Sequence, residues 1–267
     1  AIPRYFSKFS NKIYCNHQKL AIYVLMQKFK TTSRGIVSIL KSSLEMRLHL
    51  DLNRIPVHTT ILRFAKKINK QISRLLNIRK ADTVAIDATG FELESKSYYY
   101  RIVWNRKQKT KQFVRLSIVI DTDKQFILGH KIRKSRVHES RDFKFLCKKL
   151  KFKNIVADKG YDDRKIRNYV IREKKALPII PVRGYTEFYG YYAIQKRISG
   201  DCYHQRSKIE TVFSSIKRKY GSVLRNKTFI TQKVEIISKL VAYNVDRMQY
   251  YIFYLRGLHQ SSNTIIL

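Results

Sequence analysis

Three acidic residues stand out in this chain, because acids are scarce in it and because of the sequence around them. The chain has 267 residues, with 56 Lys and Arg against 19 Asp and Glu. Asp87 ends the apolar stretch Thr83–Ile86, and Asp158 ends Asn154–Ala157 before the chain runs into Gly160. A carboxylate at the end of a buried strand is costly unless a cation pairs with it. An acid that caps a strand-end turn explains either residue alone, and explains the pair less well.

Glu210 is the third acid, and it falls in a stretch predicted to be helical, residues 203–220. At roughly 100° per residue, it shares a stripe about 60° wide with one aromatic and two basic residues: Tyr203, Arg206 and Lys217. Apolar residues lie near the opposite side and should face a core: Ile209, Val212, Phe213, Ile216 and Tyr220. On an arbitrary helix such a stripe would be an ion-paired surface. Here we expect it to face the sheet edge that bears the other two acids.

Three convergent carboxylates suit divalent metal ions. Hard cations such as Mg²⁺ prefer oxygen ligands, and Mn²⁺ accepts the same set. Two ions about 3.5–4 Å apart stabilise both the attacking and the leaving oxygen of a phosphodiester. Carboxylates crowded together are tolerable only when cations are present. The sequence therefore predicts that Asp87, Asp158 and Glu210 bind two Mg²⁺ or Mn²⁺ ions and catalyse chemistry at phosphodiester bonds.

The elements that position these acids read as a catalytic α/β domain over residues 81–256. Three strands are predicted first, then helix, strand, helix and strand in turn: 83–87, 98–104, 113–121, 139–150, 154–158, 163–175 and 177–182. A Tyr-rich loop and two helices complete the order: 183–202, 203–220 and 230–255. Three strands before alternating helices and strands is the order of a ribonuclease H-like fold, a mixed sheet flanked by helices.

Residues 1–80 read as a small all-helical domain, and residues 257–267 as a C-terminal tail. Helices are predicted at His17–Lys30, at Ser33–Leu50 with its first residue as N-cap, and from Thr59 onward. One stripe of the third helix is basic: Arg63, Lys66, Lys67, Lys70 and Arg74. The opposite stripe is apolar: Ile61, Phe64, Ile68, Ile72 and Leu75. Such a helix suits a helix-turn-helix module that binds duplex DNA, and the alternative is a solvated basic face on a bundle helix.

The charge of the chain predicts an anionic partner. A formal net charge of +37 repels itself unless something anionic neutralises it, and nucleic acid is the usual partner. No apolar run approaches the roughly 18–20 residues that span a bilayer, so no membrane partner is predicted. Cys15, Cys147 and Cys202 are odd in number and widely spaced. That spacing argues against a disulfide framework or a zinc site and suits a reducing cytoplasm.

Three segments resemble the DDE transposases of insertion sequences, in the superfamily of insertion sequence families four and five. They are Ala85-Ile86-Asp87-Ala88-Thr89-Gly90, Ala157-Asp158-Lys159-Gly160-Tyr161-Asp162 and Tyr203-(2)-Arg206-(3)-Glu210-(6)-Lys217. The last matches the Tyr-Arg-Glu-Lys signature of the family at its expected spacing, and the three acids are 71 and 52 residues apart. One segment alone would be a weak signal, whereas all three in order are a specific match.

The resemblance implies an enzyme that cuts DNA at transposon ends and transfers the 3′-hydroxyl into target DNA. By this resemblance the three acids hold the metal ions, and the rest of the signature contacts phosphates near the cleaved end: Tyr203, Arg206 and Lys217. Residues 56–60 and the helices before them are similar to the region of the family that binds transposon ends. The partners implied are terminal inverted repeats, target DNA and a second copy of the chain, on the nucleoid in a prokaryotic cytoplasm.

Two other functions would use the same features. A ribonuclease H-like nuclease needs the same acids for hydrolysis alone, and the N-terminal helices count against it. An inactive DNA-binding relic of a transposase needs only the basic surfaces, and the intact acids count against it. The 52 residues between Asp158 and Glu210 are too few for the large β-insertion of some hairpin-forming relatives, which counts against a hairpin intermediate. The Tyr-rich stretch Tyr185–Tyr192 is nevertheless able to stack an unpaired base.

Overall fold

The computed structural model describes residues 2–72, 76, 80–94, 113–134, 140–182 and 203–263, and the side chains among them except those of 69–71 and 254–263. The predicted strand at 98–104 and the Tyr-rich loop at 183–202 lie outside the described residues. Also outside the described part are Arg74, Leu75, Cys202 and the side chain of Lys70. Among the described residues, no helix is long and apolar enough to cross a membrane.

Contacts divide the chain into two units. Unit 1 comprises residues 1–75 together with 236–267, and unit 2 comprises residues 76–235. From the sequence, residues 236–256 are instead predicted to belong to the catalytic domain. That domain boundary stays a prediction.

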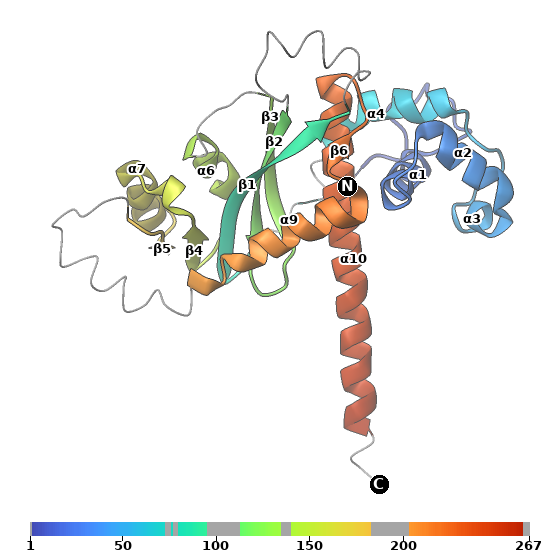
Figure 1. The fold of residues 1–267 in the computed structure, drawn as a ribbon. Coiled ribbons are helices and arrows are strands. Elements are labelled where there is room, and N and C mark those ends of the chain that lie inside the picture. The colour runs from blue at the N-terminus through green and yellow to red at the C-terminus, as the bar shows by residue number, and fades with distance from the viewer. Residues whose placement is uncertain are drawn as a thin grey trace. The chain divides into compact units, whose positions relative to one another are not determined.

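All the regular secondary structure in the described part of unit 1 is helical (Figure 1). It contains four helices from the N-terminal part of the chain: α1 (Asn16–Lys28), α2 (Ser33–Ser42), α3 (Leu44–His49) and α4 (His58–Ile72). It also contains most of α10 (Phe229–Asn263), which continues past the helix end predicted near residue 255. Nζ of Lys28 lies 2.7 Å from Oδ1 of Asp246, so an ion pair joins α1 to α10.

The single helix predicted over residues 33–50 is wrong, because the structure breaks it in two. Ser43 has extended backbone angles, ends α2 and caps α3, since its hydroxyl accepts a hydrogen bond from the Met46 N–H at 3.2 Å. The predicted N-cap, Ser33, is also wrong by one residue. The Thr32 hydroxyl accepts from the Gly35 N–H at 3.1 Å and caps α2.

The two faces predicted for α4 are confirmed wherever its side chains are described. Four of the apolar residues are buried, with relative exposures of 3% or less: Ile61, Phe64, Ile68 and Ile72. Three of the basic residues are exposed: Arg63, Lys66 and Lys67. The helix therefore packs by its apolar stripe and presents positive charge to solvent, as a DNA-contacting helix or a solvated bundle helix would.

Unit 2 is built on one mixed sheet. Among the described residues its strands are β1 (Thr83–Leu93), β2 (Phe113–Asp121), β3 (Ile127–Arg133), β4 (Asn154–Ala157), β5 (Leu177–Ile179) and β6 (Val223–Leu224). The order across the sheet is β3-β2-β1-β4-β5, and β6 pairs with the far end of β1. The first three strands run antiparallel, whereas β4 and β5 run parallel to β1. The predicted ribonuclease H-like class is confirmed, although the sequence pattern did not predict β3 or β6.

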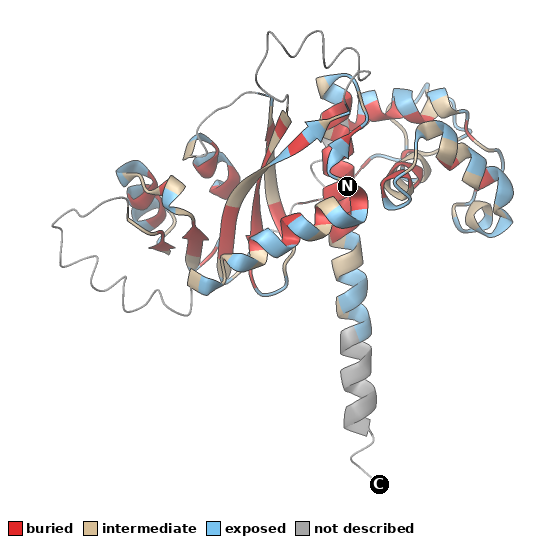
Figure 2. Cartoon of the chain, viewed as in Figure 1, coloured by how far each residue is buried: buried red, intermediate tan, exposed pale blue. Residues whose placement is uncertain are grey.

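Helices cover both faces of this sheet (Figure 1). Side chains alternate along a strand, so Val84 and Ile86 of β1 join the core formed with α6 (Ser140–Cys147) and α7 (Arg164–Asn168). The helix predicted at 163–175 divides into α7 and a π-helical turn at 169–173. The odd-numbered residues of β1 face α9 (Ser207–Tyr220), whose apolar side is buried and whose other side is exposed (Figure 2). The amphipathic helix predicted over residues 203–220 is confirmed for residues 207–220, but its predicted start is wrong, because a turn at residues 205–206 precedes α9.

Candidate active site

Asp87 and Asp158 follow the last paired residues of two neighbouring strands. The parallel pairing of β1 with β4 ends where Ile86 lies opposite Ala157, so each acid is the next residue along its strand. The strand end predicted at Asp87 is wrong, because β1 continues to Leu93 along β2. Asp87 therefore lies inside β1 but beside the point where β4 stops. The topology thus brings two acids that are 71 residues apart in sequence to the same place in the sheet.

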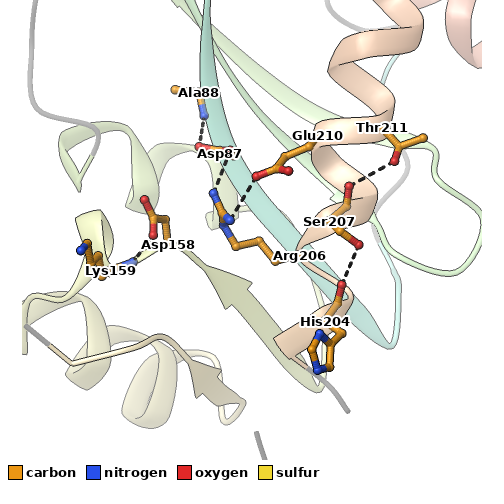
Figure 3. Close-up of polar contacts among 9 residues, drawn as sticks. All are labelled: Asp87, Ala88, Asp158, Lys159, His204, Arg206, Ser207, Glu210 and Thr211. Carbon is orange, nitrogen blue, oxygen red and sulfur yellow. Dashed lines mark hydrogen bonds and ion pairs between the residues drawn. The ribbon is translucent and has the colours of Figure 1, made fainter. Parts of the chain in front are cut away.

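Each of these carboxylates accepts a hydrogen bond from the peptide N–H that follows it. The N–H of Ala88 donates to Oδ1 of Asp87 at 2.7 Å, and the N–H of Lys159 donates to Oδ1 of Asp158 at 2.7 Å (Figure 3). In Asp158 this bond caps the short 3₁₀ turn over residues 159–161. Such charge-assisted bonds orient the carboxylate.

Glu210 lies in the first turn of α9, and its side chain is 57% exposed. Its apolar neighbours on the helix are all buried, as predicted: Ile209, Val212, Phe213, Ile216 and Tyr220. The turn before α9 carries Tyr203 and Arg206, and the N–H of Arg206 donates to the Tyr203 carbonyl at 2.9 Å. The Ser207 hydroxyl also donates to the His204 carbonyl at 2.8 Å, which joins this turn to the helix (Figure 3).

The Arg206 guanidinium lies between two of the acids (Figure 3). Its NH1 atom is 3.1 Å from Oε1 of Glu210, and its NH2 atom is 3.9 Å from Oδ2 of Asp87. The third nitrogen, Nε, is buried and has no hydrogen-bond partner within the described part of the chain. Arg206 thus offsets the charge of both acids, through a close contact with Glu210 and a longer one with Asp87. Because only one of the two contacts is close, the guanidinium is held loosely.

Lys217 contacts β1 nearer the C-terminal end of the strand than Arg206 does. Its Nζ donates to the Thr89 hydroxyl at 2.7 Å and lies 5.8 Å from the centre of the Phe91 ring. Burial lowers the pKa of Lys217, and the carboxylate of Glu92 partly offsets this effect. Lys217 therefore joins the last turn of α9 to the strand that bears Asp87. A phosphate contact by Lys217 stays a prediction, as does one by Tyr203.

The donor set fits a divalent cation, although its arrangement here is not yet a closed site. Within the described ranges, no three acidic, histidine or cysteine side chains are grouped closely enough to hold an ion. A guanidinium cation nevertheless already lies between Asp87 and Glu210, where positive charge is required. Carboxylate oxygens are the ligands that Mg²⁺ and Mn²⁺ prefer. Asp87, Asp158 and Glu210 would hold such an ion, and its charge would replace the neutralisation that Arg206 provides.

Two residues at this site, Gln205 and Thr122, were not among those that the sequence pattern predicted. Gln205 lies inside the Tyr203–Lys217 signature, next to Arg206, and it bonds the side chain of Thr122 just after β2. These partners are 83 residues apart, and nothing in the sequence links them. In the sequence, Gln205 is marked only by its place next to Arg206 of the signature, and Thr122 is not marked at all.

Comparisons with known proteins agree with this geometry. The family model described as "Transposase DDE domain" matches residues 78–245, well over half of the chain. No curated protein sequence matches the chain. A solved structure of the piggyBac transposase synaptic complex with hairpin DNA has a similar fold, with a TM-score of 0.57 and 10% identity, over 93% of this chain and 68% of that one.

A second solved structure, a pre-cleavage Mos1 transpososome, aligns over 92% of this chain and 82% of that one at 10% identity, but its TM-score is only 0.24. Two findings therefore carry the assignment, the match to the family and the mixed sheet in which two acids directly follow the β1–β4 pairing. The chain belongs to the transposase DDE domain family and is a DNA transposase.

Proposed function

We propose that this transposase cuts DNA at the ends of a mobile element and joins the new 3′-hydroxyl to target DNA. Asp87, Asp158 and Glu210 hold the divalent ions that the family uses, as two Mg²⁺ or Mn²⁺ ions. The observation that carries the proposal is the placement of the acids. Two directly follow the residues that pair β1 with β4, and Arg206 bridges one of these to the third acid on α9.

The acidic and the basic residues of this site have different roles in the proposed reaction. Bound ions supply activation of the attacking oxygen and stabilisation of the leaving oxygen. The strands β1 and β4 fix Asp87 and Asp158, and α9 adds Glu210 from the face of the sheet. Arg206 pairs with Asp87 and Glu210 and binds a phosphate near the cleaved end in the DNA complex. Tyr203 and Lys217 extend this contact along the DNA backbone.

DNA is the partner that the charge of the chain supports, since its formal net charge is +37. The piggyBac structure contains hairpin DNA in a synaptic complex, which supports double-stranded DNA as the partner here. We extend the proposal to terminal inverted repeats and target DNA, bound by two copies of this chain. Its place of action is the nucleoid in a prokaryotic cytoplasm, as the resemblance to insertion-sequence enzymes implies.

The test uses a labelled duplex that carries the inverted repeat expected beside the coding sequence. The full chain, supercoiled plasmid and Mg²⁺ are added, and nicked and joined products are counted separately. Both products are expected with Mg²⁺ or Mn²⁺, whereas Ca²⁺ should permit binding without cleavage. Wild-type protein that nicks efficiently but never joins would support the nuclease alternative, and binding without either product would support the inactive relic.

The basic stripe predicted from the sequence, Arg63, Lys66, Lys67, Lys70 and Arg74, is proposed to contact the duplex, and the first three of these residues are exposed on α4. Replacing Lys66 and Lys67 with alanine should weaken duplex binding and flatten the dependence of log affinity on log salt concentration. The expected change in slope is about 0.9 for each phosphate that the variant no longer neutralises. A gel-shift titration over a range of salt concentrations measures this slope.

The matched control replaces Lys148 and Lys149 with alanine, because these adjacent lysines are also exposed but lie beyond the end of α6. Both double variants remove the same charge, so only a specific contact separates them. Equal slopes in the two variants would mean that the α4 face is merely solvated.

A further inference from the structure

A hydrogen bond between the side chains of Gln205 and Thr122 joins the turn before α9 to the residue that follows β2. Oγ1 of Thr122 lies 2.6 Å from Oε1 of Gln205 and 3.1 Å from the Thr83 carbonyl oxygen, and its single proton is donated along the shorter contact, to Gln205. Thr122 is only 1% exposed, and its own N–H donates to the Thr83 carbonyl at 3.1 Å. Gln205 is therefore anchored, through a buried threonine, to the first residue of the strand that carries Asp87.

A second tie joins the other end of α9 to the same strand, where Lys217 donates to Thr89 at 2.7 Å. The two ties reach β1 at Thr83 and Thr89, on either side of Asp87. Glu210 lies between Gln205 and Lys217 along the chain. These two hydrogen bonds, one before and one after Glu210 in the chain, therefore fix the distance between Glu210 and Asp87.

Packing alone does not fix this distance. The buried face of α9 consists of apolar side chains, and apolar contact is nondirectional. It determines which side of the helix faces the sheet, but it holds the helix weakly against a small slide along its axis. A hydrogen bond to a buried, immobile partner is directional and does oppose such a slide.

We propose that Gln205 is a positioning residue of the active site, which acts through Thr122 to hold Arg206 and Glu210 in register with Asp87. This inference rests on the proposed function of the acids. Gln205 itself touches neither ion nor DNA in this scheme. Its replacement therefore misplaces Glu210 and loosens ion binding, whereas the affinity for duplex DNA stays the same.

The test compares Thr122→Val, which removes the hydroxyl and keeps the shape, with Thr122→Ser, which keeps the hydroxyl. Gln205→Met and the double variant Thr122→Val/Gln205→Met complete the set. Calorimetric Mn²⁺ binding to the full chain is measured first, then the rates of nicking and joining. Removing a residue that orients an ion ligand typically costs about 10- to 100-fold in metal affinity or activity. That decrease is expected for Thr122→Val and Gln205→Met, and Thr122→Ser should resemble wild type.

The double variant supplies the readout that a merely structural role would not give. If the two residues act through their bond, the double variant binds Mn²⁺ no more weakly than either single variant. Effects that multiply in the double variant would overturn the inference, as would wild-type Mn²⁺ affinity in Thr122→Val. Ser214→Ala, an exposed change on the same helix, is the control and should leave all values unchanged. A wild-type protein that binds Mn²⁺ but makes no product would count against the proposed function alone, since the Mn²⁺ comparison still decides the role of Gln205.

Discussion

Replacing Asp87 with asparagine is expected to slow DNA cleavage by about a thousandfold or more, because removing an ion ligand takes away several kcal/mol of transition-state stabilisation. The substitution keeps the shape of the side chain and removes only the charge. DNA affinity should be nearly unchanged, because it depends on phosphate contacts made by basic residues. The rate of nicking in Mg²⁺ and a gel shift at fixed salt concentration measure the two quantities.

The matched control is Asp82→Asn. Asp82 immediately precedes β1, and its exposed carboxylate lies 3.2 Å from Nζ of Lys153. The change in charge is the same, but an exposed ion pair of this kind contributes little, so wild-type cleavage is expected. Cleavage by Asp87→Asn at the wild-type rate would remove Asp87 from the catalytic site.

Replacing Arg206 with alanine should impair joining more than the first nick. A nuclease gains little from holding the cut end, whereas a transposase must keep the new 3′-hydroxyl in line with a second phosphodiester. Because misplacement by about 1 Å costs up to roughly a hundredfold in rate, we expect joining to fall by about that factor and nicking by about tenfold or less. Ion affinity should not fall, since alanine releases Asp87 and Glu210 from their present cation. Counting nicked and joined products separately gives both rates, and calorimetry gives the affinity for Mn²⁺.

Arg218→Ala is the matched control, because Arg218 is exposed near the far end of the same helix and its replacement removes the same charge. It should leave the ratio of joined to nicked products unchanged. An equal decrease of both steps in Arg206→Ala would reduce the role of Arg206 to general DNA binding. Weaker Mn²⁺ binding in that variant would mean that Arg206 helps to form the site instead of competing for it.

Local sequence patterns predicted the elements that carry the acids. Short apolar runs that end in Asp87 and Asp158 predicted β4 and the start of β1, and the helical period predicted the buried face of α9. The spacing of four residues between Arg206 and Glu210 also predicts their neighbouring positions on one helical face. These features depend on residues close together in the chain, which is why the sequence reveals them.

Features that depend on distant partners were not predictable in this way. β1 continues past Asp87 because β2 pairs with it up to Glu92, and that pairing leaves no mark in the sequence of β1 itself. β3 contains Gly129, His130 and Lys131, and this composition does not predict a strand. Its pairing with β2 makes it one. The bond between Thr122 and Gln205, like the one between Thr89 and Lys217, joins segments with no sequence relation.

The division into units has a consequence for the chain as it is synthesised. Unit 2 is inserted within unit 1, so the N-terminal helices receive their partner from α10 only when residues 236–267 have been made. The ion pair between Lys28 and Asp246 is one contact that must wait for this moment. Glu210 also comes late in the chain. A polypeptide that stops before residue 210 therefore lacks both the α10 part of the helical unit and the third acid, whereas one that stops between residues 235 and 267 has all of unit 2 with an incomplete helical unit.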